Sequence, residues 1–191
     1  MGWQTNDLYN QKILLSRQSA LIFIDQVHIM AIPKLLLQEI RKNYRLDWHG
    51  IHGVAHWAKV RNIGLRLSKQ TGANPKIVEL FAFLHDSQRL DDGLDPEHGL
   101  RASHFAKKLL GKAYDLSSSE FELLKHACER HTHGDTYANI TVMTCWDADR
   151  LDLGRVGIIP DPARLCTEAA KNLAMSNWAY QHSITRTFFE P

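Results

Sequence analysis

The feature that most constrains the fold is an apolar run that ends in an adjacent histidine and aspartate, His85-Asp86. Between Ile77 and Leu84 only Glu79 is polar. A helix that is apolar on nearly every side must be surrounded by protein, so this segment predicts a central helix. Burying the His85 imidazole and the Asp86 carboxylate is costly unless each is paired with another polar group or with a cation. A metal ion is the sharpest explanation for the pair.

Helical signals dominate the rest of the chain, and segments that alternate polar and apolar residues are almost absent. Pro33, Gly72, Asn74-Pro75, Asp95-Pro96 and the Ser117/Glu120 capping box mark expected helix ends. The sequence therefore predicts an all-α bundle of about six to eight helices in a single domain. The expected helices cover about 33–43, 53–70, 75–84, 95–111, 117–130 and 139–152, with a seventh that begins at 161.

Composition limits the classes of partner. The net charge of +2 is too small to attract a nucleic acid or a membrane surface by bulk electrostatics. The apolar run 20–24 is interrupted by Asp25 and His28 and is too short to span a bilayer. The three cysteines have no CxxC spacing, which favours a reducing, cytoplasmic setting.

Two further residues complete a pattern that suits a metal. His56 lies on the preceding predicted helix, and Asp149 lies on a predicted helix near the end of the sequence. His85 and Asp86 leave their helix about 100° apart, so both can reach one ion beside the helix end. Two imidazoles and two carboxylates favour Mn²⁺, Fe²⁺, Ni²⁺, Co²⁺, Zn²⁺ or Mg²⁺ over Ca²⁺ or a soft copper site.

At these positions the sequence resembles the HD superfamily of metal-dependent phosphohydrolases. The matching segments are His56-x-x-x-Val60, Leu84-His85-Asp86 and Ala148-Asp149-Arg150-Leu151. The resemblance covers about 46–160, and implies an HD-domain core flanked by an N-terminal arm, 1–31, and a C-terminal helical segment, 161–191. It also implies that His56, His85, Asp86 and Asp149 bind a divalent metal. Asp147, two residues before Asp149, is the reserve ligand.

Arg89 and His52 are candidates for contact with substrate. Several nucleotide-hydrolysing HD enzymes carry an acidic residue where this chain has Arg89. An arginine cannot act as a general base at neutral pH, but it binds phosphate well. The alternative for Arg89 is an ion pair with Asp91 or Asp92. His52, one turn before His56, is either a substrate or supporting residue or an ordinary exposed histidine.

Two more histidines raise the question of a second ion. HD proteins with two metals place additional histidines between the HD pair and the last aspartate, and this chain offers His98 and His131 there. With Asp86 as a bridge, such a site supports two-metal hydrolysis or, with iron, oxygen chemistry. Helix-capping or substrate-binding roles for these histidines are the alternative.

The resemblance implies that metal-activated water hydrolyses a small phosphorylated substrate. This substrate is a phosphomonoester or a phosphodiester, and a nucleotide is one candidate. Arg89 would neutralise phosphoryl charge, and His52, His98 or His131 would protonate the leaving oxygen. The two rival interpretations are a di-iron oxygenase and a non-catalytic, ligand-binding HD domain.

Overall fold

A computed structural model describes residues 32–185, so the expected N-terminal arm, 1–31, lies outside the described residues, as do residues 186–191. Within this range the chain forms helices and no strand, which confirms the predicted all-α fold. The α-helices are α2 (Lys34–Asn43), α3 (Val54–Thr71), α4 (Pro75–Leu84), α5 (His98–Leu109), α6 (Ser118–Arg130), α7 (Ile140–Leu151), α8 (Glu168–Lys171) and α9 (Leu173–Ile184). None of these helices is long and apolar enough to cross a membrane.

Local signals in the sequence set several helix ends. The Asn74 side chain accepts a hydrogen bond from the backbone N–H of Lys76 at the start of α4. Ser117 and Glu120 form a reciprocal capping box at the start of α6. Gly72 ends α3 with a φ of 74°, in the left-handed region that glycine adopts without steric cost. These three ends agree with the sequence prediction.

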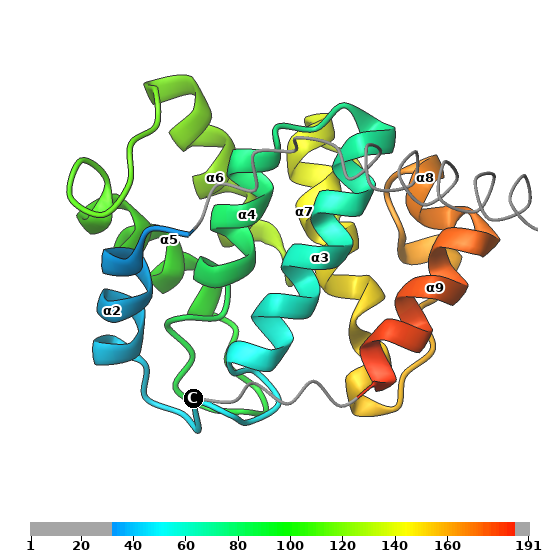
Figure 1. Cartoon of the computed structure of the whole chain (residues 1–191), viewed down its shortest axis with the longest axis horizontal. Helices are drawn as coiled ribbons and strands as arrows, with labels where there is room; N and C mark the ends of the chain where they lie inside the picture. Colours follow the sequence, from blue (N-terminus) through cyan, green and yellow to red (C-terminus); the bar gives the residue numbers. More distant parts are fainter. Residues whose placement is uncertain (1–31, 186–191) are drawn as a thin grey trace, which may run out of the picture. The chain divides into compact units, whose positions relative to one another are not determined.

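Helix α4 is the centre of the bundle, as its composition predicts. Every residue from Ile77 to Leu84 is buried. The α3, α6 and α7 helices pack around it (Figure 1). Its one buried carboxylate, Glu79, accepts a hydrogen bond of 2.6 Å from Arg61 on α3, so the charge is paired. Because α4 is held on several sides, the His85-Asp86 pair that follows it is fixed in position.

Helices α3, α4 and α7 approach one another closely at Gly64, in the middle of α3. A Cβ atom placed on Gly64 would lie 2.5 Å from Val78 Cγ1 and 3.3 Å from Ala148 Cβ. The first separation is shorter than any van der Waals contact between carbon atoms. Glycine at this position therefore allows the three helices to reach the spacing seen here.

The C-terminal segment departs from the expected single helix beginning at 161. At this position the chain instead forms a short 3₁₀ turn, Pro162–Arg164, before α8 and α9, and an earlier 3₁₀ turn, Leu153–Val156, follows α7. The Asp147 carboxylate accepts hydrogen bonds from the backbone N–H groups of Cys166 and Thr167, and Thr167 has an extended backbone. This tertiary contact replaces helical hydrogen bonds, so a helix begins only after Thr167.

Substitution of Gly64 by alanine should destabilise the protein. Overpacking costs about 1–3 kcal/mol, and the better helix propensity of alanine returns about 1 kcal/mol. We expect a net loss of about 1 kcal/mol in the free energy of unfolding, measured by urea denaturation. The Val78→Ala change removes the obstructing methyl groups, so the double variant should be more stable than the two separate effects predict. Strictly additive effects would contradict the close approach.

Candidate metal centre

Helices α3, α4 and α7 bring together the four residues of the predicted metal site. His56 Nε2 lies 3.1 Å from His85 Nε2 and 3.4 Å from Asp149 Oδ1. Asp86 Oδ2 lies 3.6 Å from the Nε2 atom of each histidine. Ligands bound at about 2.0–2.2 Å from one ion are separated by roughly 3–3.6 Å, so these donor atoms fit around a single ion.

The other oxygen of Asp86 faces a second group of potential ligands. Asp86 Oδ1 lies 3.0 Å from His98 Nε2 and 3.6 Å from His131 Nε2. The two imidazole nitrogens are 2.8 Å apart. His98 begins α5 and His131 directly follows α6, so the packing of these two helices creates the group. His56, His85 and Asp86 form one group that could hold a metal ion, and Asp86, His98 and His131 form another, so the two groups share the Asp86 carboxylate. Asp149 lies beside the first group, 3.4 Å from His56 Nε2 and 3.7 Å from His85 Nε2.

All four histidines direct Nε2 inward and Nδ1 toward an oxygen that only accepts hydrogen bonds. The Nδ1 partners are the Asp152 carboxylate for His56, the Phe81 and Ala82 carbonyls for His85, the Asp95 carbonyl for His98, and the Cys128 carbonyl for His131. Each Nδ1 must therefore carry the hydrogen, which in a neutral ring leaves a lone pair on Nε2. Lone pairs and carboxylates in such close contact repel unless a cation or proton lies between them. The chemistry of the donor set thus fits a divalent metal.

The two carboxylates remain ionised at neutral pH. Burial opposes ionisation of Asp86, but the imidazoles of His85 and His131 and of the other two histidines hold its pKa well below the usual range. Asp149 is partly buried, and His56 and His85 keep its pKa well below the usual range. Both residues are therefore available as anionic ligands.

His56 is the histidine most strongly influenced by carboxylates. Burial and the Arg155 guanidinium lower its pKa, but hydrogen bonds to Asp149, Asp152 and Asp86 raise it to about 9. In the metal-free protein the His56 ring therefore holds a proton on Nε2 at neutral pH. A metal that binds this nitrogen must displace that proton.

Arg89 provides a fixed positive charge beside the second group. Its Nη1 lies 3.1 Å from His98 Nε2 and 3.5 Å from Asp86 Oδ1. Its other nitrogens donate to the backbone carbonyls of Gly93 and Asp91, at 2.9 and 3.2 Å. The sequence offers an ion pair with the Asp91 or Asp92 carboxylate as the alternative role for Arg89. The structure shows the contacts above instead. The guanidinium occupies space next to the position of a second ion.

His52 lies beside the cluster and contributes no ligand atom to either group. Its Nδ1 is 2.8 Å from the Asp92 carboxylate, and its ring makes an edge-to-face contact with His56. Burial lowers the pKa of His52 despite the Asp92 hydrogen bond. The ring is therefore neutral at pH 7, with Nδ1–H donated to Asp92.

Asp147, the reserve ligand, points away from the cluster. Its carboxylate accepts hydrogen bonds from the Cys166 N–H at 2.6 Å, the Thr167 N–H at 2.8 Å and the Thr167 hydroxyl at 2.7 Å. Burial raises the pKa of this carboxyl group, although these hydrogen bonds oppose the rise. Asp147 thus connects α7 to the segment before α8, and Asp149 faces the histidines.

Sequence reasoning missed Asp152, which has no exposed surface and lies 2.7 Å from His56 Nδ1. Its other oxygen, Oδ1, is buried without a hydrogen-bond partner among the described residues. A carboxylate behind a ligating histidine fixes the ring and increases its basicity. The available signal was the spacing Asp149-x-x-Asp152, which places the second aspartate one helical turn after the first.

Comparison with known proteins supports the fold. Neither a protein-family model nor a curated protein matches the chain. The structure matches the crystal structure of a predicted HD superfamily hydrolase from an uncultured Thermotogales bacterium, with a TM-score of 0.58 over 77% of this chain and 84% of that chain. The sequences are 21% identical, so the likeness is one of fold. It confirms the predicted HD-type helical bundle.

Asparagine substitutions should separate the two aspartates of α7. Asp149→Asn removes an anionic ligand. Substitution of a residue that only supports a ligand lowers metal affinity by up to about a hundredfold, so loss of a ligand should lower the affinity for Mn²⁺ by at least this factor. Asp147→Asn should leave this affinity within about twofold and lower the free energy of unfolding by about 1–3 kcal/mol, because buried hydrogen bonds are lost. Isothermal titration and urea denaturation provide the two measurements. If Asp147→Asn lowered the affinity for Mn²⁺ and Asp149→Asn did not, Asp147 would be the ligand.

Metal affinity should increase with pH because His56 must lose a proton. Below pH 9 we expect the affinity for Mn²⁺ to rise by up to about tenfold per pH unit and then to level off. The charge on His56 should stabilise the metal-free fold fully below about pH 6.5, its unfolded pKa, and this contribution should disappear as the pH rises through 9.

The matched variant for this pH dependence is Asp152→Asn. Loss of the carboxylate lowers the pKa of His56, so the plateau should begin at a lower pH, and the maximum affinity should fall about 10–100-fold. A purely structural role for Asp152 would leave the shape of the pH profile unchanged. An identical profile in the two proteins would therefore contradict the positioning role.

Proposed function

We propose that the chain is an HD superfamily member that hydrolyses a phosphomonoester or phosphodiester with the help of a divalent metal. The observation that carries this proposal is the buried cluster in which His56, His85, Asp86 and Asp149 converge within hydrogen-bonding distances or slightly more. A buried anionic cluster is destabilising for a merely structural protein. A bound metal ion would compensate the negative charge of the cluster. The non-catalytic interpretation does not explain why these charged groups are buried together.

The four residues of the first group would hold the ion, with Mn²⁺, Fe²⁺, Ni²⁺, Co²⁺, Zn²⁺ and Mg²⁺ all compatible with the nitrogen and oxygen ligands. When bound, such an ion supplies a Lewis acid that brings the pKa of a coordinated water toward neutrality. The Asp149 side chain is one-fifth exposed, whereas the side chains of the other three are almost fully buried. Substrate and water would therefore reach the centre from the side of Asp149.

Arg89 would stabilise the negative charge that develops on the phosphoryl group. Its guanidinium is held at the edge of the cluster by the Gly93 and Asp91 carbonyls, so little reorganisation is required when an anion arrives. His52 is the candidate for proton transfer because it lies against His56 and is not committed to either group of ligands. Burial lowers its pKa, so the ring is neutral at pH 7 and can accept a proton from water but carries no extra proton to donate to the leaving oxygen. His98 and His131, the other expected proton donors, face Asp86 with Nε2.

The second group of ligands favours one alternative, a di-iron oxygenase on the same fold. Asp86 is placed to bridge two ions, which such chemistry requires. Against this alternative, the Arg89 guanidinium lies 3.1 Å from His98 Nε2, where its positive charge repels a second cation. We therefore favour one tightly bound ion, with Arg89 taking the place of the second positive charge.

A panel of phosphomonoesters, nucleotides and cyclic dinucleotides, tested with each divalent metal, would identify the reaction. We expect turnover of at least one phosphorylated compound with one tightly bound metal per chain. Asp86→Ala should abolish both metal binding and activity. Arg89→Gln should retain the first ion and lower kcat/KM at least about tenfold, because one charge-assisted hydrogen bond to phosphate is lost.

The controls for this panel are metal content and folding. Circular dichroism should show that both variants remain helical, so that a loss of activity reports on the site. Full turnover by Asp86→Ala would exclude the proposed mechanism. Two irons per chain in the aerobically purified protein, with oxygen consumption and no phosphate release, would favour the oxygenase.

A further inference from the structure

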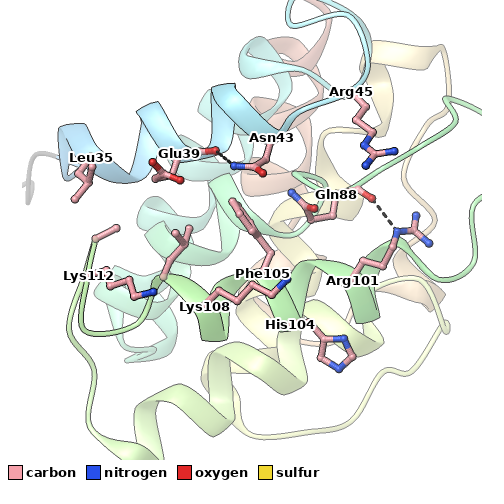
Figure 2. A pocket seen from close by; sticks show the side chains of 12 residues that line it. Leu35, Glu39, Asn43, Arg45, Gln88, Arg101, His104, Phe105, Lys108 and Lys112 are labelled. Carbon is pink, nitrogen blue, oxygen red and sulfur yellow. Dashed lines mark hydrogen bonds between the residues drawn. The ribbon is translucent and has the colours of Figure 1, made fainter.

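A groove between α2 and α5 is separate from the metal centre. It has a volume of about 730 Å³, within the range of small-molecule sites, about 300–1,000 Å³. Figure 2 shows Arg45, Gln88 and Arg101 at one end of this groove and Leu35 and Lys112 at the other. None of the proposed metal ligands lines the groove. Gln88, two residues after Asp86 in the sequence, is the lining residue nearest to the His85-Asp86 pair along the chain.

The groove is strongly basic. Arg101 and Lys108 lie on one face of α5, seven residues apart, Lys112 lies in the turn that follows this helix, and Arg45 lies opposite, after α2. Glu39 is the one acidic residue in the lining. Several positive charges around one concave surface concentrate the electrostatic potential there and attract anions.

Three of these four cations lack an acidic partner in the part of the chain that the structure describes. No carboxylate lies within 4.0 Å of Arg45, Lys108 or Lys112 among residues 32–185. Other surface cations in this range are also without an ion pair, so what distinguishes the groove is that these three share one concave surface with Arg101. The cations of the groove are thus available to an external anion.

The groove also has an apolar floor. Phe105, Leu109 and Ala113 line it and are themselves buried, while Leu35 contributes a half-exposed side chain from α2. Inorganic phosphate alone would leave these surfaces uncovered. A ligand with phosphate groups and an apolar or flat portion would contact both the cations and the floor.

Arg101 connects the groove to the second group of ligands. It donates two hydrogen bonds to the Asp95 carboxylate and one, at 3.1 Å, to the Gln88 carbonyl. Asp95 in turn accepts from the Leu90 N–H through its carboxylate and from His98 Nδ1 through its carbonyl. A ligand phosphate that competes with Asp95 for Arg101 would therefore act on residues that hold His98.

We propose that this groove binds a phosphorylated small molecule of nucleotide size, with phosphates on Lys108 and Lys112, the apolar portion on Phe105 and Leu35, and the opposite end of the ligand facing Arg45 and Arg101. This site is additional to the metal centre and does not depend on the proposed hydrolysis. Contact with Arg101 gives bound ligand a route to the Asp95–His98 contact.

Binding of ATP and of tripolyphosphate to the full chain in EDTA tests the proposal without requiring a metal or activity. We expect ATP to bind more tightly than tripolyphosphate because it also covers the apolar floor. Lys108→Ala and Lys112→Ala should each weaken ATP binding by about five- to tenfold, the effect of one charge-assisted contact. Glu39→Gln should tighten it severalfold because the one acidic lining residue becomes neutral.

Two matched variants locate the site. Lys107→Ala removes a cation from the same helix that lies over the Phe121 ring, outside the groove, and it should leave ATP binding unchanged. Arg89→Gln removes the cation at the metal centre and should also leave it unchanged. Equal losses of ATP affinity in Lys107→Ala and Lys108→Ala would show that ATP responds only to the overall positive charge and not to this groove. A loss confined to Arg89→Gln would place the anion at the metal centre. Either result would overturn the proposal.

Discussion

The buried carboxylate of Asp86 is the group on which the centre depends. Its two oxygens face different pairs of imidazoles, His56 and His85 on one side and His98 and His131 on the other. The negative charges of Asp86 and Asp149, beside imidazole nitrogens that face inward, would be unstable without a bound proton or cation nearby. Arg89 supplies one positive charge, and a divalent ion supplies the rest in our proposal.

The surrounding architecture serves to hold this cluster in a fixed geometry. The α4 helix is enclosed by apolar contacts, so the residues that follow it have little freedom. Gly64 allows α3, α4 and α7 to lie close enough for three ligand-bearing segments to meet. Behind the histidines, carbonyl groups and the Asp152 carboxylate set which nitrogen of each ring faces inward. The packing of the helices thus determines where the ligand residues lie, and the hydrogen bonds to Nδ1 determine which nitrogen of each histidine ring carries the hydrogen.

The metal centre and the basic groove share one short segment of the chain. Residues 86–98 contain the Asp86 carboxylate, Arg89, Asp95 and His98, and several of their hydrogen bonds connect the two regions. Arg101 reaches this segment from α5 and also lines the groove. A change at one end of this network therefore has a physical path to the other. This arrangement follows from α5 beginning at a proposed ligand and continuing along the groove.

The sequence by itself determined the all-helical fold, the central position of α4 and the helix ends at Asn74, Ser117 and Gly72. These features depend on local spacing, capping and hydrophobic pattern, which are properties of contiguous residues. The resemblance already favoured Asp149 over Asp147 as a ligand, but only the tertiary structure showed that Asp147 instead accepts hydrogen bonds from residues about twenty positions later. The same holds for Asp152 behind His56, 96 residues away, for Arg89 beside His98, and for the basic groove. Such pairings arise from helix packing between distant segments, so a local spacing such as Asp149-x-x-Asp152 can suggest a residue but cannot identify its partner.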